Sequence, residues 1–95
     1  MAIEITEFKP HEKNTLRGFL TARLTNIGLE IRGICLHEKN GKRWLSMPAK
    51  LWEKNGETKY VYILDFYDRQ KSDQFQACAL KALDDFFKKP PSAPP

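Results

Sequence analysis

The sequence is poor in the residues that build most catalytic and metal sites. It has two cysteines and two histidines, and a tetrahedral metal site needs about four ligands. It also lacks a glycine-rich loop of the kind that cradles a phosphate. We therefore predict no catalytic residue, no metal and no cofactor. Cys35 and Cys78 are interpreted as reduced thiols, as in a cytoplasmic protein.

Long apolar runs are missing as well. No run of about 18 apolar residues occurs, so we expect no membrane contact through a spanning helix. Residues 1–5 lack the basic region and apolar block of a secretory signal. The chain has 95 residues, of which 41% are hydrophobic and 29% charged, which is typical of one folded domain. We expect a single cytoplasmic domain over residues 1–89 and a disordered, proline-rich tail over residues 90–95.

Apolar and polar residues alternate in five segments, which predicts five β-strands. The segments are Ile3–Phe8, Leu16–Asn26, Leu29–His37, Arg43–Met47 and Thr58–Phe66. The third changes its apolar face midway, which predicts a β-bulge at Gly33. Asn40-Gly41 predicts a two-residue hairpin turn. Lys9–Asn14 is interpreted as a turn and Pro48–Glu57 as a loop, and the last strand is expected to be covered on both faces.

The period changes from two to about 3.6 near the C-terminus, which predicts a helix ending near Lys88. Its apolar stripe consists of Phe75, Cys78, Ala79, Ala82, Leu83 and Phe86. Ser72 or Asp73 is the expected N-cap. The predicted fold is α+β: an antiparallel sheet of about five strands followed by one C-terminal helix. One helix covers only one face of such a sheet, so we expect the other face to meet a second copy in a homodimer, or a ligand with flat aromatic rings.

The positive charge is concentrated in the middle of the chain. The formal net charge is +4, and residues 39–59 carry six basic and two acidic residues, which equals the whole excess. Basic and aromatic residues are interleaved there and on the second strand, a combination typical of single-stranded nucleic-acid binding. The candidate binding residues are Arg17, Phe19, Arg23, Lys42, Arg43, Trp44, Lys50, Trp52, Lys54 and Lys59. Core packing is the alternative for Trp44, whereas Trp52 lies in a polar segment and is the preferred stacking residue.

Residues 28–50 resemble the central part of the SpoVG (septation protein) family, in which a strand, an Asn/Gly turn and a strand ending in Met-Pro-Ser-Lys follow in the same order. Here the last motif is Met47-Pro48-Ala49-Lys50, and the order of elements matches over roughly residues 2–88. The resemblance implies a small bacterial or phage regulator that dimerises through its sheet and binds DNA or RNA. Of the family's binding residues it carries over only Lys50. The strand order followed by one helix is also similar to that of whirly-type transcriptional coactivators, which bind single-stranded DNA.

Three functions follow as hypotheses. The preferred one is a dimeric regulatory module that binds single-stranded DNA or RNA with low sequence specificity. The second is a protein-interaction or assembly module that uses an exposed sheet face. The third is a small enzyme that uses Cys35 or the aspartates, for which the sequence names no substrate.

Overall fold

Six antiparallel strands in two sheets and one C-terminal helix make up the computed structural model, which describes residues 2–88. The larger sheet has four strands in the order β1-β2-β3-β4, and the smaller has two, β5 and β6. The strands are β1 (Ile3–Lys13), β2 (Leu16–Leu24), β3 (Leu29–Lys39), β4 (Lys42–Ser46), β5 (Ala49–Lys54) and β6 (Glu57–Tyr62). The helix is α1 (Arg69–Lys88). The α+β class is therefore confirmed, with six strands in place of about five. The predicted tail lies outside the described residues.

The hydrophobic core lies between the four-stranded sheet and α1. Phe75, Ala79 and Leu83 of the predicted helix stripe are fully buried. They pack against alternate residues of the strands, among which Leu20 and Ile34 are also fully buried. The alternation of β2 is confirmed for Leu20, Ala22 and Leu24, which are buried in this core, whereas Phe19 lies on the other face of the sheet.

Glycine and asparagine shape the connections as the sequence predicts. The pairing of β2 with β3 shifts register between Leu20 and Ala22, opposite Gly33, which has φ of +81°. This bulge is the predicted one, and glycine adopts that φ without strain. Asn40 and Gly41 have φ of 53° and 80°, the left-handed conformations that a type I′ turn needs at both positions.

The ends of β1 and α1 differ from the predictions. β1 continues to Lys13 through the segment interpreted as a turn, which is possible because it is an edge strand, where Pro10 costs no internal ladder bond. The helix begins at Arg69, ahead of the predicted start. Its N-cap is Asp68, whose Oδ1 accepts hydrogen bonds from the backbone N–H groups of Gln70 and Lys71 at 2.9 and 3.4 Å.

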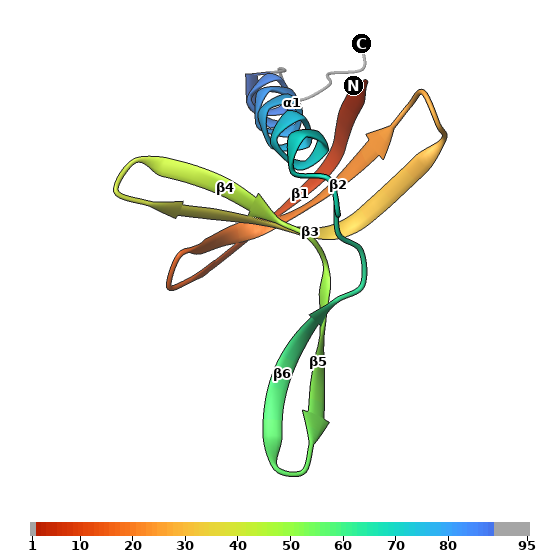
Figure 1. Cartoon of the computed structure of the whole chain (residues 1–95). Helices are drawn as coiled ribbons and strands as arrows, with labels where there is room; N and C mark the ends of the chain where they lie inside the picture. Colours follow the sequence, from red (N-terminus) through yellow and green to blue (C-terminus); the bar gives the residue numbers. More distant parts are fainter. Residues whose placement is uncertain (1, 89–95) are drawn as a thin grey trace.

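The segment 48–57, predicted to be a loop, forms β5 and its turn and pairs with β6. Asn55 and Gly56 join the two strands with φ of 53° and 78°, again a type I′ turn. We call residues 49–62 the arm. It projects away from the four-stranded sheet on the side opposite α1 (Figure 1). Every residue of β5 and β6 is exposed, so the expectation that the last strand is covered on both faces is wrong for the single chain.

Candidate nucleic-acid interface

The arm has two chemically different faces, which follow from its register. Residues directly opposite each other in an antiparallel pair point to the same side. One side, the basic face, consists of Lys50, Trp52, Lys54, Glu57, Lys59 and Val61. The other, the apolar face, consists of Ala49, Leu51, Glu53, Thr58, Tyr60 and Tyr62. The hairpin is therefore amphipathic, although neither face is buried.

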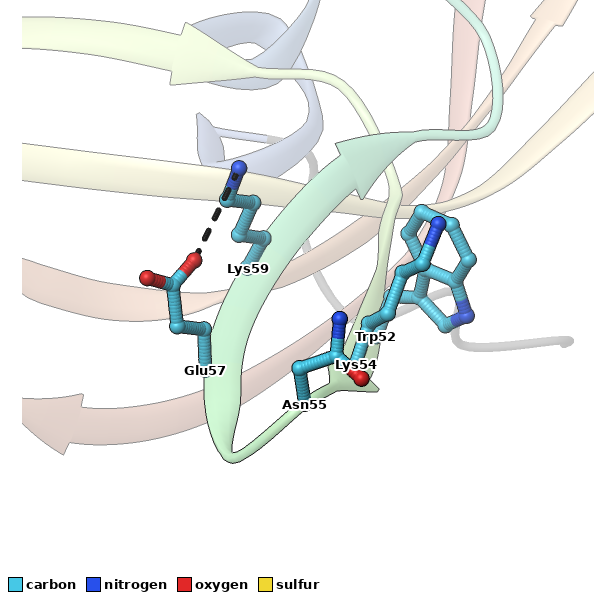
Figure 2. A pocket seen from close by; sticks show the side chains of 5 residues that line it. All are labelled: Trp52, Lys54, Asn55, Glu57 and Lys59. Atoms are coloured by element: carbon cyan, nitrogen blue, oxygen red, sulfur yellow. Dashed lines mark ion pairs between the residues drawn. The ribbon is translucent and has the colours of Figure 1, made fainter.

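The basic face presents an indole ring between cations. Trp52 is half exposed and lies directly opposite Lys59 in the register. The Nζ of Lys54 lies 5.6 Å from the centroid of the Trp52 ring, within range of a cation–π contact. These side chains line a hollow of about 370 Å³ together with Asn55 and Glu57, as Figure 2 shows for the lining residues.

The lysines of the basic face keep most of their charge available. Lys59 is 4.0 Å from a carboxylate oxygen of Glu57, and both side chains are more than two-thirds exposed (71% and 74%). An exposed pair at this distance contributes little. A phosphate group, which carries more charge density, competes easily with such a contact.

The remaining six candidate residues lie on the four-stranded sheet and not on the arm. The three arginines among them have partners inside the chain. Arg17 donates to the carbonyl oxygens of Asn14 and Leu16 at 2.8 and 3.2 Å. Arg23 donates to Glu30 at 2.8 Å, and Glu30 also binds Arg32.

These ion pairs have electrostatic consequences. The hydrogen bonds from Arg23 and Arg32 lower the pKa of the Glu30 carboxyl, and the hydrogen bond to Glu30 raises the pKa of Arg23. The single negative charge of Glu30 thus partly neutralises the positive charges of Arg23 and Arg32 near the end of β2. Arg23 therefore has an ionic partner within the chain, at the exposed end of β2.

Strand β4 carries three more candidates. Arg43 points to α1 and forms a two-point ion pair with Asp84, which raises the pKa of Arg43 and lowers that of Asp84 through the hydrogen bonds between them. Trp44 is partly exposed and stacks on the His37 ring, with centroids 5.4 Å apart and planes 11° apart. Lys42 is exposed at the turn after β3. Trp44 and Trp52 therefore lie on different elements.

The sheet face away from α1 and the apolar face of the arm enclose a second, larger hollow, which we call the groove. Its volume is about 760 Å³. The sheet contributes Phe19, Cys35 and His37, the arm contributes Tyr60 and Tyr62, and Lys13 and His11 line it from β1. Phe19, the tenth candidate, is half-buried here and lies 5.6 Å from the His11 ring.

His37 is fixed at the floor of the groove by both ring nitrogens. Nδ1 lies 3.0 Å from the hydroxyl of Thr15 and Nε2 lies 3.1 Å from the hydroxyl of Ser46. Burial lowers the pKa of His37, which favours the neutral ring. The thiol of Cys35, two residues away, donates a hydrogen bond to the Gly33 carbonyl oxygen at 3.8 Å. The two hydrogen bonds give His37 a structural role, because they connect β3 to Thr15 and to β4.

Sequence reasoning missed the apolar face of the arm, because it treats residues 48–57 as a loop. The signal was present, since Asn55-Gly56 is flanked by Leu51-Trp52 and Tyr60-Val61-Tyr62, the pattern of a two-residue hairpin. Within residues 2–88, no group of three or more metal-ligand side chains is placed to bind an ion. In the same range, no helix is both long enough and apolar enough to cross a membrane.

Comparison with known proteins gives no match to this chain. No protein-family model matches it, and neither a curated protein nor a solved structure gives a significant match. The similarity to the SpoVG family over residues 28–50 is therefore an expectation from the sequence motif alone. The functional assignment therefore depends on the side chains of the arm and of the four-stranded sheet described above.

Proposed function

We propose that this protein binds single-stranded nucleic acid, DNA or RNA, through the basic face of the arm. The observation that carries the proposal is an exposed indole flanked by lysines on a hairpin that stands clear of the core. Flat rings stack on unpaired bases, and cations neutralise the phosphates that connect those bases. Both interactions act on any sequence, so binding of low sequence specificity is expected.

The shape of the arm favours a single strand over a duplex. The Trp52 ring is half exposed, and a flat ring stacks on a base only where that base is free of its neighbours, as in a single strand. Lys50, Lys54 and Lys59 share one side of a two-stranded ribbon, so a backbone that follows the ribbon meets them in succession. The positive charge concentrated in residues 39–59 also steers a polyanion toward this part of the molecule.

A salt titration with a labelled oligothymidylate tests the proposal. Three phosphate contacts predict a slope of about −2 in the plot of log affinity against log salt concentration, from about −0.7 per contact on a single strand. Replacing Lys50 by Gln removes one contact and makes the slope shallower by about 0.7. The matched control is Lys81→Gln, which changes the total charge equally on α1, on the other side of the sheet.

Two results would reject the proposal. One is the absence of binding at low salt, where electrostatic attraction is strongest. The other is an equal loss of affinity in the Lys50→Gln and Lys81→Gln variants, because net charge alone would then explain the binding. A duplex of the same sequence, measured beside the single strand, shows whether unpaired bases are required.

A further inference from the structure

The groove has the size and the lining of a small-molecule binding site. Its volume of about 760 Å³ falls within the range of roughly 300–1,000 Å³ that is usual for such sites. Apolar and aromatic side chains form most of its walls, whereas its two basic residues, His11 and Lys13, both come from β1. Apolar walls that carry a few placed polar groups are typical of sites that orient a single small ligand.

Aromatic rings on both sides make the groove suited to a flat ligand. Phe19 and His37 lie on the sheet side, and Tyr60 and Tyr62 lie on the arm side. The His37 ring is held by hydrogen bonds at both of its nitrogens and is stacked on Trp44. A ring that is fixed before binding loses little freedom when a ligand arrives. Flat aromatic ligands stack on such rings, so we expect a ring in this part of the groove.

The β1 side of the groove favours an anion. Among the described residues that line the groove, none is an aspartate or a glutamate. Lys13 takes part in none of the ion pairs found within residues 2–88, so its ammonium group is available to a ligand. His11 adds a second cation when its ring is protonated. Phosphate groups form strong, charge-assisted hydrogen bonds with such donors.

The aromatic rings and the cations are separated along the sheet. Lys13 pairs with Leu16 in the register of β1 and β2, and Leu16 and Phe19 both line the groove. A register shift between Leu16 and Gly18 brings these two to the same face. Three residues of a strand span about 10 Å. A ligand that contacts both Phe19 and Lys13 therefore needs a spacer between its ring and its anionic group, as the ribose of a nucleotide provides.

We propose that the groove binds a free nucleoside monophosphate, with its base against Phe19 and its phosphate at Lys13 and His11. One lysine and one histidine match one phosphate. The described lining holds no further lysine or arginine, so a longer strand would find no cation there for its next phosphate. Tyr60 and Tyr62 lie on the face of the arm opposite Trp52. The groove is therefore separate from the basic face, and the proposal does not depend on oligonucleotide binding.

Calorimetric titration of the full chain with adenosine monophosphate (AMP) and three simpler probes tests the proposal. AMP is expected to bind with a dissociation constant below about 1 mM. Adenosine lacks the phosphate and ribose 5-phosphate lacks the base. Each is expected to bind about tenfold more weakly, because a charged hydrogen bond or a stacked ring is lost. Benzoate joins its ring and its carboxylate without a spacer and is expected to be equally weak.

Two variants assign these contacts to residues. Lys13→Gln is expected to weaken AMP binding about tenfold and to leave adenosine unchanged. Phe19→Leu is expected to weaken both about five-fold, because it removes the ring that meets the base. The matched controls are Lys81→Gln on α1 and Tyr67→Leu at an exposed position outside the groove, which are expected to change neither. All four positions lie outside the hydrophobic core of the described chain, and circular dichroism verifies that the variants are folded.

Three results would overturn the proposal. The first is AMP binding no tighter than adenosine or ribose 5-phosphate. The second is an equal loss of AMP affinity in Lys13→Gln and Lys81→Gln. The third is a loss of AMP affinity in Trp52→Ala, which would place the nucleotide on the basic face of the arm. Trp52→Ala is expected instead to weaken only the oligothymidylate, so a failure of this proposal and a failure of the proposed function are distinguishable.

Discussion

Arg43 of β4 and Asp84 of α1 form a two-point ion pair, with Nη1–Oδ1 and Nη2–Oδ2 distances of 2.8 and 2.9 Å. By its sequence pattern, Arg43 is one of the candidate nucleic-acid-binding residues. Its pairing with Asp84 gives both residues a structural role, because it ties the edge strand to the helix. Beside it, the Gln76 side chain accepts from the Leu45 N–H at 2.8 Å and donates to the Leu45 carbonyl at 2.6 Å. The amide thus takes the place of a neighbouring strand at the edge of the sheet.

These two contacts are expected to differ in their contribution to stability. Gln76→Ala leaves the N–H and carbonyl groups of the buried Leu45 without their side-chain partner, which is expected to lower the free energy of unfolding by about 1–3 kcal/mol. Arg43→Met removes a partly exposed ion pair and is expected to cost less than about 1 kcal/mol. Urea unfolding followed by circular dichroism measures both. A larger loss for Arg43→Met than for Gln76→Ala would contradict this ranking.

The pKa of His37 predicts a pH dependence of stability. Burial lowers its pKa in the folded chain below the ordinary value of 6.5. As the pH falls below 6.5, the unfolded chain therefore binds a proton at His37 before the folded chain does, and the free energy of unfolding decreases. The decrease ends once the pH is below the folded pKa. At pH values above 6.5 both states are neutral at this ring, and His37 adds no pH dependence.

Replacing the ring tests this prediction directly. Urea unfolding at about pH 7.5 and at about pH 5 is expected to show a smaller decrease in stability for His37→Gln than for the wild-type chain. His11→Gln is the control, because it removes the other histidine at an exposed position. Equal decreases in the wild-type chain and in His37→Gln would show that other groups cause the pH dependence.

Most of the four-stranded sheet and the helix stripe can be predicted from the sequence, because local patterns determine them. Alternation in residues 16–24 and helical spacing from Phe75 to Phe86 each report which side of an element is buried. The turn at Asn40-Gly41 and the bulge at Gly33 need left-handed backbone, which few other residues adopt. These features depend on neighbours along the chain and are confirmed.

The arm and the partners of the arginines could not be predicted in the same way. Ala49–Lys54 has three charged residues in six, so its composition indicates a loop unless the pairing with β6 is known. Asp84 meets Arg43 across 41 positions of sequence, a separation that no local pattern reports. Of the candidate binding residues, the four on the arm share one face, whereas the other six are distributed over β2 and β4.

Gly18 of β2 lies close to the partly buried ring of Phe8 on β1. A Cβ atom at this residue would lie 2.4 Å from Cζ of Phe8 and 2.7 Å from the carbonyl oxygen of Lys9. Gly18→Ala is therefore expected to lower the free energy of unfolding by about 1–3 kcal/mol, through forced displacement of the ring and of β1. Adding Phe8→Leu is expected to recover part of the loss, since it removes the nearer atom. Thermal unfolding of both variants measures this, and a fully stable Gly18→Ala chain would contradict it.

The two tryptophans are expected to respond differently to an oligonucleotide. The chain has only these two indoles, so Trp44→Phe leaves Trp52 as the sole reporter and Trp52→Phe leaves Trp44. Bases that stack on an indole quench its fluorescence, and Trp52 stands on the open arm, whereas Trp44 is already stacked on His37. We expect quenching by single-stranded DNA in Trp44→Phe and little in Trp52→Phe.

Affinity supplies the second readout of this comparison. One stacked base contributes about 1–3 kcal/mol, so Trp52→Ala is expected to weaken binding roughly 5-fold to 150-fold. The salt slope should hardly change, since no phosphate contact is removed. Trp52→Phe keeps a flat ring and is expected to retain much of the affinity. If quenching occurs through Trp44 instead, the bases lie on the four-stranded sheet, and the lysines of the arm then serve only to attract the strand.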